Sequence, residues 1–405
     1  MTTSADRLAR RYVLLALAIE QHVPGYIDAY TGPSEWRDQA KAKGLREVAE
    51  LEKEASSLAA AIADNTEMDP QRHDFLTREV RAMRTGLRML QGERLTLAEE
   101  TEALYDIVPE WVDEIIFDEA HRILDEFLPP GDSLIERMTI RKKAIEVPLD
   151  RVESLLHETI AELRRRTQER FPLPSDESFE LQLVTDQPWY AYNWYLGDFR
   201  SRIDINTDLP LHITDFADLM AHEGYPGHHT ERSIKEAELA RDKGHIERCV
   251  VLINSPSCVV SEGIATRALS TLMTDEEQVA WHAQKLFPRA GFGHLDAHSE
   301  QKIRAAGRKL EGVAGNAAFL LHDQGASADE IVAYMQKWEL ASTEEALKMI
   351  QFLGNSLFRS YVFTYRYGGA MLDALFETQG DRDHWFARLL AEAVTPSQIR
   401  AWTVG

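Results

Sequence analysis

The chain has 405 residues, of which 44 % are hydrophobic and 28 % charged, a composition typical of a soluble globular protein with a substantial core. Its formal net charge of −22 disfavours a nucleic-acid partner, because a phosphate-binding surface needs the opposite sign. No apolar run approaches the roughly 20 residues that span a membrane. We therefore expect a cytoplasmic protein with neither nucleic acid nor membrane as partner; the sequence leaves the oligomeric state open.

Helical spacing of apolar residues dominates the first part of the chain. We expect helices over residues 8–22, 43–64, 74–91, 96–107, 110–127 and 149–170. Arginines precede the apolar residues 12–19, as in a signal peptide, but Glu20 follows at once, and an amphipathic helix fits better. Residues 1–172 are thus predicted to form an N-terminal helical scaffold.

The pattern changes after residue 172. Residues 179–184 and 201–205 alternate apolar and polar side chains, as half-buried strands do. We expect a small antiparallel sheet beside the next helix, which Thr214 or Asp215 is placed to cap. Further helices are expected over 249–273, 276–284, 298–324, 329–338, 344–376 and 381–393. The predicted fold class is mainly α, with residues 173–405 as a second region of one continuous two-lobed domain.

Residues 222–229 read His-Glu-Gly-Tyr-Pro-Gly-His-His. Imidazole nitrogen and carboxylate oxygen are ligands of Zn²⁺, and a carboxylate beside bound water serves metal-assisted hydrolysis. On a regular helix the residue six positions after His222 would point roughly 120° away from it. Pro226 and its neighbouring glycines predict a broken turn that brings a later histidine back. We favour His228 as the second ligand, with His229 as the alternative.

A third protein ligand is expected from a separate helix downstream. Glu262 lies in an apolar run, where a carboxylate without a partner is costly and a metal ion would stabilise it. The alternative is a helix-terminal glutamate paired with a neighbour such as Arg267. A histidine-rich Gly/Pro loop would explain the glycines, but not the glutamate beside His222 or the glutamate within an apolar run at 262.

The motif His-Glu-x-x-Pro-Gly-His-His, followed by Glu-Gly-x-Ala at 262–265, resembles the bacterial domain-of-unknown-function family numbered 885, regarded as gluzincin-like zinc metallopeptidases. Residues 128–137, 201–207 and 365–368 are similar to other elements of that family. Ile264 stands where the family usually has tryptophan, and the chain is short for the family. The resemblance implies a large helical metallopeptidase-like fold and a peptidase-like activity.

Other candidate residues lie in two further segments. The resemblance singles out Tyr365, whose phenol can stabilise an oxyanion. Tyr361 lies four residues earlier on the same helical face and is expected to bind substrate. Arg366 is placed to recognise a substrate carboxylate, although a tyrosine-rich core helix with a salt-bridged arginine is the alternative. In gluzincin-like enzymes an edge strand binds the peptide backbone, and the strand containing Ile203 and Ile205 is expected to do so here.

Together these features predict a zinc-dependent hydrolase, most simply a metallopeptidase that cleaves a peptide or small amide. His222, His228 and Glu262 would hold one Zn²⁺ per chain. Glu223 would act as general base, and Tyr365, helped by His229, would stabilise the oxyanion. Two alternatives are a non-catalytic metal- or peptide-binding protein with a degenerate site and a metal-dependent hydrolase of non-peptide amides or esters. The intact Glu223 disfavours the first alternative, because a binding protein needs no base.

Overall fold

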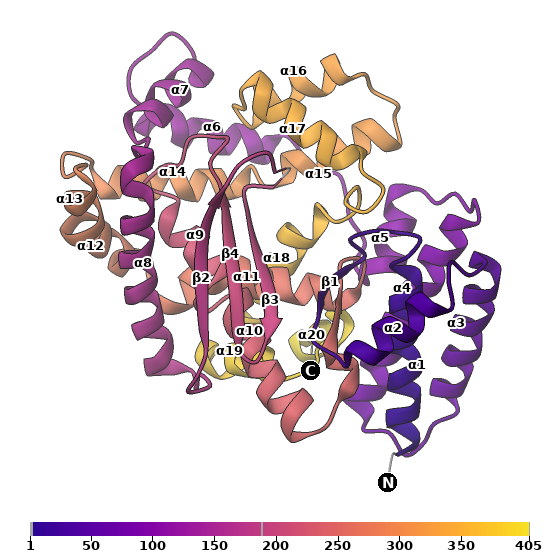
Figure 1. The fold of residues 1–405 in the computed structure, drawn as a ribbon. Coiled ribbons are helices and arrows are strands. Elements are labelled where there is room, and N and C mark those ends of the chain that lie inside the picture. Colours follow the sequence, from indigo (N-terminus) through magenta and orange to yellow (C-terminus); the bar gives the residue numbers. More distant parts are fainter. Residues whose placement is uncertain (1–2, 188, 405) are drawn as a thin grey trace.

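The N-terminal helices pack against one another at one side of the molecule (Figure 1). The structure, a computed structural model, describes residues 3–187 and 189–404. The N-terminal bundle consists of α1 (Ser4–Ile19), α2 (Ser34–Ala42), α3 (Val48–Ala63), α4 (Pro70–Leu90) and α5 (Leu97–Tyr105). Side-chain caps set the first residues: Thr3 and Thr96 form capping boxes, and Asp69 caps α4 directly before Pro70.

The amphipathic helix expected at the N-terminus is α1. It buries Leu8, Tyr12, Leu15 and Ile19 within the bundle, at the spacing of one helical face. Across residues 3–187 and 189–404, no helix combines the length and the apolar character that crossing a membrane requires.

A second group of helices lies beyond the end of the sheet (Figure 1). It contains α6 (Ile115–Phe127), α7 (Leu134–Ala144), α14 (Ala297–Lys309), α15 (Gly312–His322), α16 (Ala328–Trp338) and α17 (Thr343–Gly354), and α8 (Leu149–Arg170) runs beside the sheet. The prediction of one helix over 298–324 is wrong, because the chain turns at Leu310 and Glu311 between α14 and α15. The predicted helix over 344–376 is likewise two helices, because α17 ends at Gly354 and the next begins at Phe363.

The sheet near the motif has three strands, β2 (Ser178–Val184), β3 (Ala191–Gly197) and β4 (Arg200–Asn206), in the order β2-β4-β3. It is mixed rather than wholly antiparallel, because β2 runs parallel to β4 and β3 antiparallel to it. β4 is therefore the central strand, not an edge strand. The expected strand addition at Ile203 and Ile205 is wrong, because the backbone groups of β4 already pair on both sides. A second, antiparallel sheet joins β1 (Ile27–Tyr30) to β5 (Val250–Leu252), where the sequence predicted the start of a helix.

Four helices surround the histidine motif: α9 (Phe216–Glu223), α10 (His228–Lys235), α11 (Pro256–Leu272) and α18 (Phe363–Gln379). α11 and α18 approach backbone to backbone, since a Cβ on Gly263 would lie 2.7 Å from the carbonyl oxygen of Gly368. Asp215 precedes α9, but its side chain makes no capping hydrogen bond. The remaining elements are α12 (Asp275–Trp281), α13 (Phe287–Ala290), α19 (Arg382–Ala391), α20 (Pro396–Val404), the π-helical turns Glu236–Asp242 and His282–Leu286, and the 3₁₀ turn Ile246–Cys249.

Buried apolar side chains form two clusters. The first joins the N-terminal bundle to α14–α17 and includes Tyr12 and Phe117. The second fills the space between α8, the three-stranded sheet and α9, and includes Phe216. α11 contributes to both, with Val259 in the first cluster and Val260 in the second. The helix that carries Glu262 is therefore packed from two sides.

Candidate metal centre

A tight reversal between α9 and α10 places the first two histidines. α9 ends at Glu223, and α10 begins at His228. Gly227 fits the reversal because it has no side chain: a Cβ there would lie 1.9 Å from the carbonyl oxygen of His222. The chain thus folds back against the end of α9, and the imidazole ring of His228 lies 4.8 Å from that of His222, centroid to centroid.

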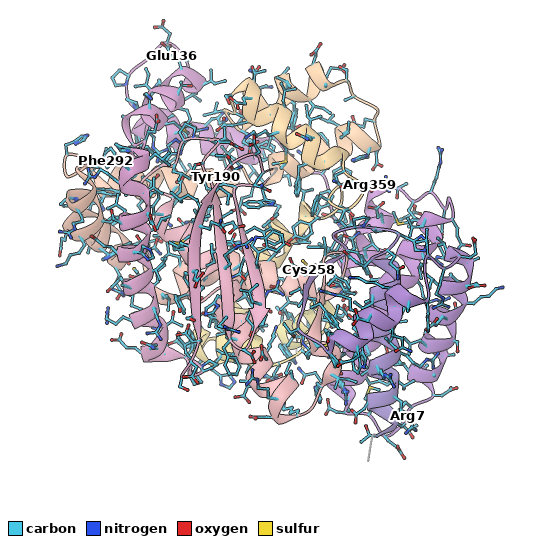
Figure 2. The ribbon with its side chains drawn as sticks, in the orientation of Figure 1. Arg7, Glu136, Tyr190, Cys258, Phe292 and Arg359 are labelled. Carbon is cyan, nitrogen blue, oxygen red and sulfur yellow. The ribbon has the colours of Figure 1, made fainter. Side chains whose placement is uncertain are left out.

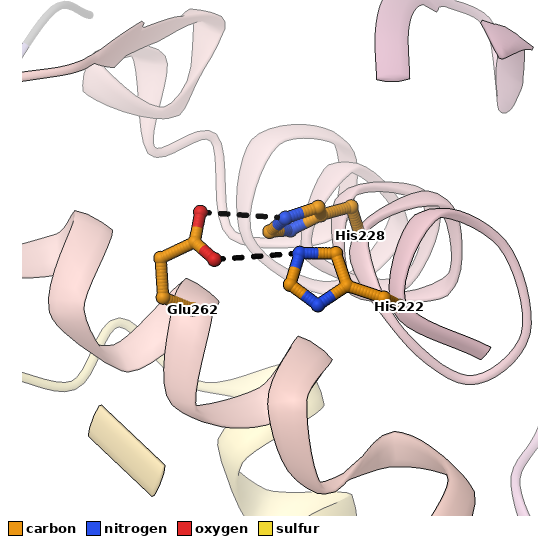
Figure 3. Close-up of side chains that lie close together, drawn as sticks. All are labelled: His222, His228 and Glu262. Carbon is orange, nitrogen blue, oxygen red and sulfur yellow. Dashed lines mark ion pairs between the residues drawn. The ribbon is translucent and has the colours of Figure 1, made fainter. Parts of the chain in front are cut away.

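His222, His228 and Glu262 converge from three helices (Figure 3). Nε2 of His222 lies 3.4 Å from Oε2 of Glu262, and Nε2 of His228 lies 3.5 Å from Oε1. One ligand atom from each residue lies within 4.8 Å of the others. No other group of three or more histidine, cysteine or acidic side chains in the described part of the chain is arranged in this way.

The spacing suits a single metal ion. Two ligand atoms that are each about 2.1 Å from a tetrahedral Zn²⁺ lie about 3.4 Å apart, close to both nitrogen–oxygen distances. Glu262 gives an independent reason, since its side chain is 5 % exposed and its Oε2 accepts no hydrogen bond from any described residue. A buried carboxylate oxygen without a partner is unfavourable, and a cation would stabilise it. Arg267, the alternative partner, instead pairs with Asp373 at 2.8 Å.

Neighbouring hydroxyl groups orient two of the three side chains. Tyr361 donates a hydrogen bond to Oε1 of Glu262 at 2.6 Å. Nδ1 of His228 lies 3.1 Å from the hydroxyl oxygen of Ser261, which donates its own proton to the carboxylate of Glu231. Ser261 must therefore accept from Nδ1, so the proton of a neutral His228 is on Nδ1 and the lone pair of Nε2 faces Glu262.

The charges within the cluster depend on one another. Burial lowers the pKa of His228, but the carboxylate of Glu262 outweighs burial and raises this pKa to about 9. Burial raises the pKa of Glu262, but His228 and His222 outweigh it and hold the pKa well below its usual value. Glu262 is therefore ionised at neutral pH, and a proton competes with a metal ion for Nε2 of His228.

The cluster lines a cavity of about 220 Å³, and Cys258, near the middle of the molecule in Figure 2, lies on its wall. Glu223 lines the same cavity and is buried, and burial raises the pKa of its carboxyl group. Asn193 of β3 also lines it; its amide donates to the carbonyl oxygen of Glu223 at 2.7 Å, and its Oδ1 has no donor among the described residues. A carboxylate with a raised pKa is well suited to accept a proton near neutral pH.

The two predicted tyrosines occupy different positions. Tyr365 lines the cavity, its side chain is 36 % exposed, and its ring lies 6.3 Å from that of His222. Loss of solvent and the charge of Glu262 raise the pKa of Tyr365 well above its usual value, so the hydroxyl keeps its proton and can donate it in a hydrogen bond. Tyr361 is buried, and its hydroxyl is already used by Glu262. Tyr361 therefore positions Glu262, and the expectation that it binds substrate is corrected accordingly.

The structure does not bring His229 to the cluster. Its side chain is fully buried between Ser201, 2.8 Å from Nδ1, and Glu177, 2.9 Å from Nε2. Burial lowers the pKa of His229, so the neutral ring donates to Glu177 and accepts from Ser201. Glu177 also accepts hydrogen bonds from Tyr225 and Arg164. His229 thus belongs to a buried network that joins α10 to the sheet, and it does not line the cavity.

Three other predicted substrate-binding residues do not line the cavity of the metal centre. Ile203 and Ile205 are fully buried in the second core cluster, and neither lines the cavity. Arg366 lines a separate cavity, described below. β3, rather than β4, borders the candidate site, through Tyr192 and Asn193 among others.

Several site residues were not predicted from the sequence. Ser261 directly precedes Glu262, and Glu231 follows His228 by one helical turn, so helical spacing could have suggested both. Asn193 lies on β3, and Glu177, the partner of His229, lies before β2, both far from the motif in the chain. Only the fold brings Asn193 to the cavity and Glu177 to His229.

No protein-family model matches the chain, and no curated protein matches it. Solved structures that share its fold include two bacterial proteins. A candidate lipoprotein from Colwellia psychrerythraea is 14 % identical, with a TM-score of 0.53 over 88 % of this chain and 69 % of that one. A candidate lipoprotein of unknown function from Shewanella oneidensis is 11 % identical, with a TM-score of 0.52 over 91 % of this chain and 76 % of that one. Metallocarboxypeptidase 1 from Trypanosoma cruzi is 13 % identical, with a TM-score of 0.47 over 99 % of this chain and 94 % of that one.

Proposed function

We propose that the protein is a zinc-dependent hydrolase and that its substrates are peptides. The observation that carries the proposal is the buried Glu262 oxygen that lacks a hydrogen-bond donor and faces the imidazole nitrogens of His222 and His228. Two histidines and one glutamate are the protein ligands of a class of catalytic zinc sites that keep a position open for water or substrate. The resemblance of residues 222–229 and 262–265 to the family numbered 885 supports the same proposal.

The neighbouring residues suit the chemistry of hydrolysis. A zinc ion held by the three ligands would polarise a carbonyl group and make a bound water more acidic. Glu223, in the same cavity, takes the proton of the attacking water and returns it to the leaving amine. The Tyr365 hydroxyl, protonated at neutral pH, donates a hydrogen bond to the carbonyl oxygen as negative charge develops on it.

β3 supports a peptide as the substrate. Within the described residues it pairs only with β4, so it is an edge strand, and it borders the cavity. An extended peptide could add to its unpaired edge through backbone hydrogen bonds. Oδ1 of Asn193, which has no donor among the described residues, is a further acceptor for a substrate N–H group. A simple ester would use neither of these features.

Metal analysis combined with two substitutions tests the proposal. Elemental mass spectrometry should find about one zinc per wild-type chain, and much less in Glu262→Ala. Glu223→Gln should keep its zinc while its turnover of a peptide library falls by about 100- to 10,000-fold. No zinc in the wild type after zinc is supplied would overturn the proposal. Zinc binding without any peptide cleavage by the wild type would overturn the peptidase proposal and favour either the non-catalytic binding protein or the hydrolase of non-peptide amides or esters.

A further inference from the structure

A second cavity, of about 680 Å³, borders the helices that carry the metal centre. Its wall includes six cationic side chains: Arg267, Arg304, Arg308, Lys309, Arg366 and Arg382. Four acidic side chains face it: Asp218, Asp275, Glu311 and Asp373. Six cations against the four acids of the lining, with Glu119 outside it paired to Lys309, leave an excess of one positive charge, although the chain as a whole carries −22. Such an excess in a concave site attracts anions.

The six cationic side chains differ in whether they already have a partner. Four have partners: Arg267 pairs with Asp373, Arg304 with Asp218 and Lys309 with Glu119, while Arg382 donates to the carbonyl oxygen of Ser270. The side chains of Arg308 and Arg366 form no ion pair or hydrogen bond with any described residue. Burial raises the pKa of Glu311, and the charges of Arg267, Arg308 and Arg366 all oppose this rise.

Arg308 and Arg366 come from different helices, α14 and α18, and line one cavity. Guanidinium groups bind phosphate oxygens through paired N–H donors, and two guanidinium groups without partners among the described residues suit a dianion better than a monocarboxylate. We propose that the second cavity binds a phosphate group, held by Arg308 and Arg366 with Arg267 beside them. This site is separate from the metal centre and does not depend on the proposed hydrolase activity.

The same two helices, α11 and α18, line both cavities. α11 carries Glu262 to the first cavity and Arg267 to the second, and α18 carries Tyr365 to the first and Arg366 to the second. The two helices touch at Gly263 and Gly368 without an intervening side chain. A phosphate group bound between α14 and α18 therefore braces the helix pair that forms one wall of the metal centre.

Calorimetric titration of inorganic phosphate and of pyrophosphate into the full chain tests the proposal. The ionic strength is held constant with sodium chloride, because general screening would otherwise imitate binding. We expect saturable binding of one phosphate per chain, weakened about tenfold or more in both Arg366→Gln and Arg308→Gln. Arg289→Gln is the matched control, because Arg289 is an exposed arginine paired with Glu158 outside this cavity, and it should bind phosphate as the wild type does.

A zinc ion could itself bind phosphate, so the titration is repeated with Glu262→Ala. Binding that persists in this variant supports the second cavity, and binding that disappears assigns the phosphate to the metal centre and overturns the proposal. Absence of saturable binding, or equal binding by the two arginine variants and the wild type, also overturns it. Because Arg308 is exposed, its substitution should not disturb the fold. If circular dichroism shows that Arg366→Gln is unfolded, the phosphate affinity of Arg308→Gln tests the proposal by itself. Tighter binding of pyrophosphate indicates a phosphoanhydride ligand, and equal binding indicates free phosphate.

Discussion

Replacing Tyr361 by phenylalanine tests how strongly an oriented carboxylate contributes to metal affinity. The hydroxyl donates to Oε1 of Glu262 at 2.6 Å in a buried setting. A hydrogen bond to a charged group contributes about 1.5–3 kcal/mol, which corresponds to a zinc dissociation constant raised about 10- to 150-fold. Phenylalanine keeps the ring and its edge contacts with Tyr105 and Tyr365, so the fold should be retained.

A competition titration against a chromophoric zinc chelator measures this change. Tyr365→Phe is the matched control, because it removes the same group four residues away and Tyr365 makes no hydrogen bond to Glu262. Its zinc affinity should stay within about twofold of the wild type, while its kcat for peptide cleavage falls. Unchanged zinc affinity in Tyr361→Phe would refute the reasoning. Equal losses of zinc affinity in both variants would refute the different roles given to the two tyrosines.

Three further predictions concern stability. Gly227→Ala should destabilise the fold by about 3 kcal/mol or more, because the added Cβ would lie 1.9 Å from a carbonyl oxygen. Gly86→Ala, in open space on α4, should instead stabilise the fold by about 0.5–1 kcal/mol. Urea denaturation of the two variants measures both changes in the free energy of unfolding. Burial raises the pKa of Glu339 from 4.5 to about 7, so its contribution is most favourable below pH 4.5 and is lost as the pH rises to about 7. Glu339→Gln should therefore stabilise the protein by about 3 kcal/mol at pH 8 and by little at pH 4.5, as thermal melts at the two pH values would show; equal effects would contradict the shift. His229→Ala should lower the free energy of unfolding by about 2–4 kcal/mol yet keep zinc, whereas His228→Ala should lose zinc and stay folded. Loss of zinc in both variants, measured by elemental analysis, would contradict the different roles given to the two histidines.

The arrangement of the motif could be predicted in part because its backbone constraints are local. Pro226 prevents a regular helix after His222, and Gly227 permits the close approach that only glycine tolerates. These two residues predict a reversal, and a reversal brings the later histidines back towards His222. Glu262 was identifiable because a carboxylate within an apolar run needs a partner. The long amphipathic helices followed from apolar periodicity for the same local reason, as the helix predicted over 149–170 shows.

Features that depend on pairing between distant segments could not be predicted. Alternation identifies a strand but not its neighbours, so the central position of β4 between β2 and β3 had no signal in residues 201–205. The same limit applies to His229, whose partner Glu177 lies before β2 and reaches α10 only through the parallel pairing of β2 with β4. Short elements such as β1 and β5 stabilise each other only once paired, so their isolated sequences resemble loops or helix starts.

The candidate metal centre lies where the two core clusters meet. His222 and His228 lie on helices that pack around the second core cluster, whereas Tyr361, which orients Glu262, belongs to the first. Glu262 lies on α11, the helix shared by both clusters. Because both cores hold its helix, the backbone of Glu262 is fixed at the wall of the cavity. A metal ion at this point would link the two cores, and its binding free energy would contribute to the stability of the junction as well as to the chemistry of the site.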